Sequence, residues 1–197
     1  MSSFVTMPAI VKESSSGYIT NTIQTELFNK KREIECVGEI TADSVYSLIL
    51  QLRYLQEENP KKEITMYINS PGGSVTSGLA LYDVMKAIRC PVRTVCVGIA
   101  ASMAAILFLS GDKRDILPHA QVMIHDPLIH GGVGGSALQL ERISKDLMRT
   151  RQIMCDIIMK HTGRSMEEVY AKTAMDSYFD AEESIAWGLA DRIIRKI

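Results

Sequence analysis

The sequence lacks any continuous apolar run of 18 residues or more, so it predicts no membrane-spanning helix. Its first residues, MSSFVTMPAIVKESSSG, lack a charged start followed by an apolar run, so we expect no secretory signal. An excess of charge of either sign is also missing, because 22 basic and 23 acidic residues give a net charge of −1. This balance gives no support to a general role in binding nucleic acid.

Cysteine and histidine are scarce, with four residues of each kind. The cysteines have no CxxC or metal-like spacing, and each of them lies beside apolar residues: Cys36, Cys90, Cys96 and Cys155. We therefore expect buried, reduced thiols and no metal site. Reduced cysteines also favour a cytoplasmic location.

Strand and helix patterns alternate along most of the chain. Residues 1–22 are rich in Ser and Thr without a clear period, so we expect a mobile amino-terminal arm there, followed by one domain over 23–197. Hydrophobic spacing predicts helices over 41–60, 75–90, 101–111 and 136–163, and strands over 63–70, 92–98, 113–117 and 121–128. Two short helices and a final strand complete the chain. The alternation indicates an α/β fold with βαβ units and a mainly parallel sheet.

The helix over 136–163 is too long for a compact body of this size. We expect it to project from the body and to pack on another subunit. Gly163 is placed to end this helix. At the start of the earlier helix, either Thr41 or Asp43 is a suitable cap.

Ser102 is an isolated polar residue in the small-residue stretch VCVGIAASMAAILFLSGD, over 95–112. A serine in the first turn of a helix lies near free backbone N–H groups and the positive end of the helix dipole, where an oxyanion is stabilised. A serine at such a position is also a common helix cap. From this stretch alone, a catalytic and a capping role both stay open.

A nucleophilic serine needs a base, and the base needs a carboxylate that orients it. His125 lies at the end of an apolar strand in VMIHDP, where a plain core imidazole is the alternative. Asp176 lies in TAMDSYFDAEE before a helix start, where a helix cap is the alternative. His161 is at a helix carboxyl end, where capping explains it.

The glycine turn PGGS, over 71–74, exposes backbone N–H groups between a strand and a helix. Gly73 would supply one donor of an oxyanion hole, and Met103, directly after Ser102, would supply the other. Together these signals resemble a serine hydrolase with the chain order Ser, His, Asp.

From about Val37 to Ile194 the sequence resembles ClpP, the proteolytic subunit of the Clp protease (peptidase family S14). The segments that carry the resemblance are YINSPGGSVTSGLALYDVM, GIAASMAAILFLSG, LPHAQVMIHDPL, KHTGRSMEEV and YFDAEESIAWGLAD. The resemblance implies a ClpP/crotonase-like fold. It also implies a catalytic triad of Ser102, His125 and Asp176, an oxyanion hole from Gly73 and Met103, and no metal or other cofactor.

The resemblance implies an assembly as well. Members of the family form heptameric rings that stack in pairs to tetradecamers, and an AAA+ unfoldase of the ClpX, ClpC or ClpA type delivers unfolded polypeptides into the enclosed chamber. Gly131, Gly132 and Val133, in a strand formed by HGGVGG, would bind substrate as an added strand. Residues 129–163 would form the handle between rings, and residues 1–22 the axial loop or propeptide region.

The sequence departs from the family pattern in several respects, two of which are the following. Active ClpP usually has an acid–Arg pair directly before the triad Asp, whereas this chain has Ala174 and Met175. Thr65 and Asp115 stand where the docking pocket for the unfoldase is usually aromatic, and a charge at Asp115 should weaken binding of an apolar loop.

These departures leave a second hypothesis open: a low-activity regulatory or structural ring subunit that is active only in a mixed complex with another ClpP paralogue. A third, a crotonase-type acyl-CoA enzyme, shares the fold. It would need acid–base carboxylates in place of Ser102 and His125, so the segments ASMAA and MIH argue against it.

Overall fold

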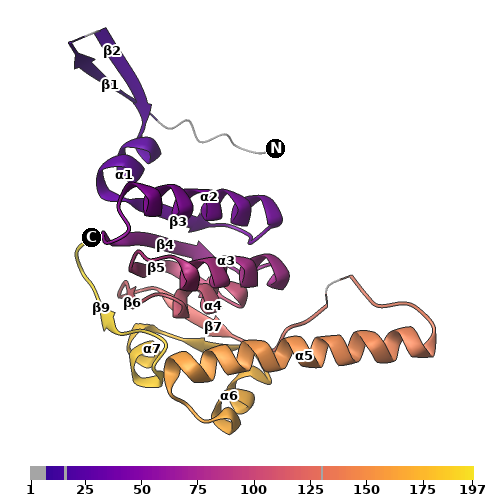
Figure 1. The fold of residues 1–197 in the computed structure, drawn as a ribbon. Coiled ribbons are helices and arrows are strands. Elements are labelled where there is room, and N and C mark those ends of the chain that lie inside the picture. Colours follow the sequence, from indigo (N-terminus) through magenta and orange to yellow (C-terminus); the bar gives the residue numbers. More distant parts are fainter. Residues whose placement is uncertain (1–7, 16, 130) are drawn as a thin grey trace.

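The computed structural model describes residues 8–15, 17–129 and 131–197. Its centre is a mainly parallel sheet whose strands lie in the order β3–β4–β5–β6–β9 (Figure 1). Their bounds are Glu33–Val37, Ile64–Ser70, Val92–Ala101, Lys113–Ile116 and Arg192–Ile193. Strand β7 (Gln121–Ile124) pairs in parallel with the carboxyl end of β5, and β8 (Ser177–Phe179) pairs antiparallel with β7. The α/β class with βαβ units, predicted from the sequence, is confirmed.

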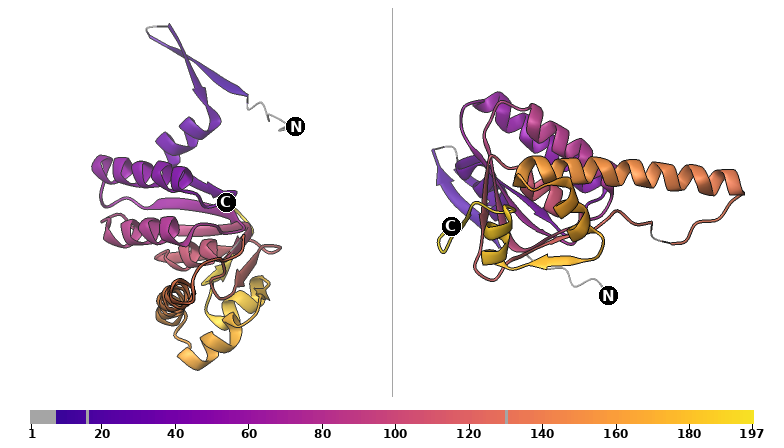
Figure 2. Two further views of the ribbon diagram at one scale, coloured as in Figure 1. Left: turned by 90° about the vertical axis from the view of Figure 1, so that its right-hand side faces the viewer. Right: turned by 90° about the horizontal axis from the view of Figure 1, so that it is seen from below.

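Helices α2 (Ala42–Glu58) and α3 (Val75–Ala87) lie side by side against the sheet (Figures 1 and 2). Thr41 caps α2 through a capping box, so Thr41 and not Asp43 fills that role. The short helix α4 (Met103–Leu109) has all seven residues buried and packs against both α3 and the long helix α5 (Ala137–Thr162). The stretch of small and apolar residues around Ser102 therefore forms the centre of the core.

Helix α5 (Ala137–Thr162) starts at a capping box on Ser136 and ends at Gly163, whose φ of 71° is left-handed. Its buried residues all lie in its last third, at Met154, Cys155, Ile157 and Ile158. The rest of the helix extends away from the body (Figure 2). The projecting helix predicted from the sequence is therefore present.

The amino-terminal region differs from the arm without regular structure that the sequence predicted. Strands β1 (Ala9–Ser14) and β2 (Gly17–Thr22) form an antiparallel hairpin, and α1 (Ile23–Lys31) follows it. The carboxylate of Glu26 in α1 binds Lys12 of β1, Asn21 of β2 and Lys30, so one side chain holds hairpin and helix together. These hydrogen bonds lower the pKa of Glu26 to about 2. Residues 1–7 of the predicted arm lie outside the described residues.

Several helix and strand boundaries differ from the predicted ones, and two of these differences affect candidate functional residues. Strand β5 continues to Ala101, so α4 begins only after Ser102. The strand predicted over 121–128 ends at Ile124, which leaves His125 just beyond it. Helices α6 (Met166–Thr173) and α7 (Ala181–Trp187) are the two short helices expected, but β8 between them was not predicted.

All four cysteines are free and buried, as the sequence predicted. Burial raises the pKa of Cys36 to about 11 and that of Cys96 to about 12, so both are neutral thiols near pH 7. Across the described ranges, no helix combines the length and the apolar character needed to cross a bilayer.

Candidate active site

Ser102 occupies a strained turn between β5 and α4. Its φ of 54° and ψ of −122° are rare for a residue with a side chain, and they cost on the order of 1–3 kcal/mol. Its backbone N–H donates to the Met123 carbonyl at 2.9 Å, which fixes the turn against β7. The Ser102 side chain makes no capping hydrogen bond to α4. The alternative of a simple helix cap therefore does not explain this serine.

His125 faces Ser102 because the carboxyl ends of two parallel strands meet at one edge of the sheet. Strand β7 pairs with the last residues of β5, with Met123 opposite Ala101. His125 follows β7 and Ser102 follows β5, and His125 Nε2 lies 2.8 Å from Ser102 Oγ. The His125 side chain is 13% exposed, so most of the imidazole is shielded from solvent where it contacts the serine.

Asp176 completes a row of three side chains. It lies between α6 and β8, and β8 pairs with β7 so that Ser177 is opposite Ile124. Its Oδ1 is 3.3 Å from His125 Nδ1, and its side chain is 61% exposed. Asp180 caps α7 through a capping box, so the capping role considered for Asp176 belongs to Asp180.

The glycine turn packs directly on Ser102. A Cβ added to Gly72 would lie 2.7 Å from Ser102 Cβ, 2.7 Å from the Ala101 oxygen and 3.2 Å from the Met103 nitrogen. Gly73, with a φ of 147°, forms a parallel bridge to Ile40, and an added Cβ there would lie 2.3 Å from the Ile40 oxygen. The first N–H groups of a helix have no partner within it, and Met103 is the first residue of α4. The backbones of Gly72 and Met103 therefore meet beside the Ser102 side chain.

Two further contacts shape this region, and the sequence pattern does not predict them. Asn69 accepts a hydrogen bond from the Ile99 N–H at 3.2 Å, and its side chain fills the space that a Cβ on Gly98 would need. Gly78 of α3 gives room to the Met103 side chain, because an added Cβ would lie 2.2 Å from Met103 Cγ. Both glycines occur in apolar surroundings that gave no sign of a close contact.

The segment predicted to bind substrate forms no strand in the described part of 125–136. Gly131 and Gly132 have φ values of 90° and 83°, which belong to turns and not to extended chain. Both glycines and Val133 are exposed. The glycines meet no atom within 4 Å where a Cβ would be added. His130 lies outside the described residues. Within the described residues of this segment, the predicted strand is therefore absent.

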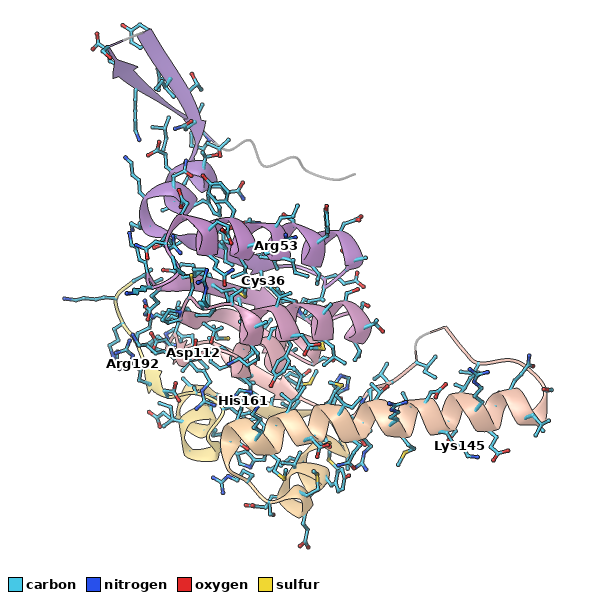
Figure 3. The ribbon with its side chains drawn as sticks, in the orientation of Figure 1. Cys36, Arg53, Asp112, Lys145, His161 and Arg192 are labelled. Atoms are coloured by element: carbon cyan, nitrogen blue, oxygen red, sulfur yellow. The ribbon has the colours of Figure 1, made fainter. Side chains whose placement is uncertain are left out.

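The sequence predicted that Asp115 would place a charge in the docking pocket. The structure corrects this prediction. Its side chain is fully buried, and its carboxylate binds Arg93 at 2.5 Å and Arg192 at 2.5 Å; Arg192 is labelled in Figure 3. Burial raises the pKa of Asp115, but the hydrogen bonds from Arg192 and Arg93 outweigh it and hold the pKa below its ordinary value. The negative charge is therefore neutralised within the sheet.

The described surface pockets lie away from the triad, around α1, β3 and β4. One, of about 520 Å³, is lined by residues of α1, β3 and α2; another, of about 420 Å³, includes Tyr67, Val97 and Ile197. Glu33 and Glu35 line both pockets, so this face combines apolar and acidic groups.

His161 does not act as a cationic helix cap. Its Nε2 lies 3.1 Å from the Tyr82 hydroxyl, and the ring is partly buried between α3 and α5. Burial, together with the nearby charges of Lys86, Arg114 and Lys160, lowers the pKa of His161 to about 4. The imidazole is therefore neutral at pH 7.

No group of three or more His, Cys, Asp or Glu side chains that could hold a metal ion occurs within residues 8–15, 17–129 and 131–197. The arrangement instead offers a hydroxyl, an imidazole and a carboxylate in one row, with the start of α4 beside them, which suits acyl transfer. Comparison with known families gives a match to Clp protease over residues 15–197. This range covers the sheet, the projecting helix and all three polar residues. The chain therefore belongs to the Clp protease family of ClpP-type proteolytic subunits.

Proposed function

We propose that this chain is a serine endopeptidase subunit in which Ser102 is the nucleophile, His125 the general base and Asp176 the orienting carboxylate. The observation that carries the proposal is the 2.8 Å contact between Ser102 Oγ and His125 Nε2, made by a serine held at a φ of 54°. A strained backbone at a partly buried serine whose hydroxyl caps nothing is typical of a functional site. A structural serine in the same core would not need this geometry.

The chemistry follows from the positions of the atoms. Ser102 Oγ attacks the peptide carbonyl carbon while His125 Nε2 takes its proton. Asp176 accepts a hydrogen bond from His125 Nδ1–H and stabilises the imidazolium that forms. The N–H groups of Gly73 and Met103 bind the oxyanion. His125 then gives its proton to the leaving amine, and water releases the acyl group by the same steps.

We propose that the substrate is unfolded polypeptide bound in extended form along Gly131, Gly132 and Val133. Backbone pairing is tolerant of sequence because it uses main-chain groups. The described residues of this segment form no strand, and Gly131 and Gly132 have open space beside their backbone, which supports binding of a substrate strand there. A site this tolerant needs restricted access.

Restricted access is the physical reason for a ring assembly. Exposed apolar side chains occur along α5, at Leu138, Leu140, Met148 and Ile153, and they support packing of this helix on another subunit. We propose heptameric rings stacked to a tetradecamer in the cytoplasm, with an AAA+ unfoldase of the ClpX, ClpC or ClpA type supplying the chains.

A second candidate is a subunit that becomes active only beside another ClpP paralogue. Asp176 is 61% exposed, and its contact to His125 is long for a hydrogen bond, at 3.3 Å. Directly before it, Met175 is 71% exposed and Ala174 carries no charge, so neither can form the usual ionic contact between rings. A partner ring would have to order Asp176 by other means.

The two candidates are separated by measuring assembly and cleavage in one sample. Native mass spectrometry of the purified chain would be combined with hydrolysis of a small fluorogenic peptide, with Ser102→Ala as the control. A tetradecamer that cleaves, and loses cleavage in Ser102→Ala, supports an autonomous peptidase. A single ring without cleavage supports the mixed complex. Cleavage that persists in Ser102→Ala contradicts the proposed nucleophile.

A further inference from the structure

An ion pair behind the triad involves the residue that follows His125. Asp126 Oδ2 accepts a hydrogen bond from Arg151 Nε at 2.6 Å, and both side chains are largely shielded, at 32% and 20% exposure. The Asp126 backbone N–H donates to the Thr173 carbonyl at 2.7 Å. One residue therefore carries two anchors, one to the middle of α5 and one to the end of α6.

The two hydrogen bonds of Asp126 also constrain His125, because the two residues are adjacent in the chain. Strand β7 ends at Ile124, so sheet hydrogen bonds hold His125 on its upstream side alone. Downstream, Pro127 has no N–H to donate, and Leu128 and Ile129 are exposed. The contacts of Asp126 are thus the nearest fixed points on the downstream side of His125.

Arg151 and Thr173 connect Asp126 to the segment that carries Asp176. Arg151 lies over the Tyr170 ring at 4.1 Å, which ties α5 to α6. Thr173 is the last residue of α6, three positions before Asp176. The elements that carry the base and the carboxylate are therefore fastened to each other through Asp126.

Stability alone does not account for this carboxylate. Asp126 Oδ1 is buried and has no hydrogen-bond partner within the part of the chain that the structure describes. A buried oxygen of this kind costs free energy on folding, and a neutral side chain would avoid that cost. The cost indicates that the position of the carboxylate serves something other than stability.

We infer that Asp126 and Arg151 form a positioning pair that holds His125 in register with Ser102 and Asp176. This inference rests on the proposed peptidase function. Neither residue touches the reacting atoms; the pair acts through the backbone of the base. Misplacement of a catalytic group by about 1 Å is enough to cost about 100-fold in rate.

The first test compares peptide hydrolysis by Arg151→Met, Asp126→Ala and the double variant. We expect kcat to fall about 10- to 100-fold in each single variant with KM nearly unchanged, because the base is moved and the substrate-binding segment is not. The double variant should be no slower than the slower single variant, since the two residues act as a unit. Arg151→Lys should recover part of kcat, because it keeps the charge beside Asp126.

Arg164→Met is the matched control. Arg164 also pairs with a carboxylate, Glu168 at 3.2 Å, and also lies over an aromatic ring, that of Trp187 at 5.7 Å. Its partners lie at the start of α6 and in α7, away from Asp126 and Thr173, so its variant should lose thermal stability and keep kcat. Equal losses of kcat in Arg164→Met and Arg151→Met would show a merely structural role and overturn the inference.

Crystal structures of the wild type and Arg151→Met provide a measurement that does not depend on turnover. We expect the distance from His125 Nε2 to Ser102 Oγ to rise from 2.8 Å to beyond hydrogen-bonding range. An unchanged distance overturns the inference even if the wild type is active. Absence of hydrolysis in an assembled wild-type tetradecamer contradicts the proposed function instead, and the two failures are thus distinguished.

Discussion

A single methyl group added at Gly72 should impair catalysis more strongly than it impairs folding. An alanine there places Cβ 2.7 Å from Ser102 Cβ and 2.7 Å from the Ala101 oxygen, well inside contact distance. The backbone φ of 99° adds strain for any residue with a side chain. The backbone strain costs about 1–2 kcal/mol and the overpacking about 1–3 kcal/mol. The free energy of unfolding of Gly72→Ala should therefore be lower than that of the wild type by about 2–5 kcal/mol.

The larger effect should be on activity. Because the clash falls on Ser102 and on the start of α4, the hydroxyl must move relative to His125 or the glycine turn must retreat from Met103. Either movement should lower kcat for a fluorogenic peptide by about 100-fold. The assay is peptide hydrolysis together with thermal unfolding of the same preparation.

Gly38→Ala is the control that isolates backbone strain. Gly38 has a comparable φ of 80°, but an added Cβ there meets no atom within 4 Å. It should therefore lose about 1–2 kcal/mol of stability and keep full kcat. If Gly72→Ala retains the kcat of Gly38→Ala, the packing of the glycine turn against Ser102 is not important for catalysis, and the reasoning is refuted.

Three further predictions concern charges. The pKa of His161 is about 4 in the folded protein and about 6.5 in the unfolded chain. Between these pH values the unfolded chain binds more protons. The free energy of unfolding should therefore fall by roughly 2–3 kcal/mol as the pH falls from 6.5 to 4. His161→Gln should flatten this part of the melting-temperature profile, and an unchanged slope would contradict the assignment. Asp115→Ala should lower the free energy of unfolding by about 2–4 kcal/mol in denaturant titrations, because Arg93 is left without its buried partner; a loss below 1 kcal/mol would show that the pair is not important for folding. Asp180→Ala should reduce stability by about 1 kcal/mol with kcat intact, whereas Asp176→Ala should reduce kcat and leave the capping box of α7 in place; the opposite pattern would reverse the two roles.

Sequence patterns predicted most of the body because its apolar residues repeat with regular periods. The helices that became α2, α3 and α5 have strong spacing and recognisable caps, and Gly163 ends α5 as expected. Strand β8 was missed because it has three residues, too few for a period. The hairpin β1–β2 was missed because it is exposed along nearly all of its described length, so its two faces show no alternation of apolar and polar residues.

The residues of the candidate site could be singled out from the sequence, but their contacts could not. Ser102 and His125 come together because the parallel strands β5 and β7 end at one edge of the sheet, and Asp176 joins them because β8, which it precedes, pairs antiparallel with β7. Local spacing does not reveal which residues the sheet brings opposite one another. Asp115 was misjudged for that reason, since its partners Arg93 and Arg192 lie 22 and 77 positions away along the chain.

The most direct test of the central claim is labelling with a fluorophosphonate probe, followed by mass spectrometry of the modified peptide. Such probes react with serines that a neighbouring base activates. We predict one adduct on Ser102 in the wild type, none in Ser102→Ala, and strongly slowed labelling in His125→Ala. Failure to label Ser102 in an assembled wild-type protein, or equal labelling in His125→Ala, would contradict the assignment of Ser102 and His125 as nucleophile and base.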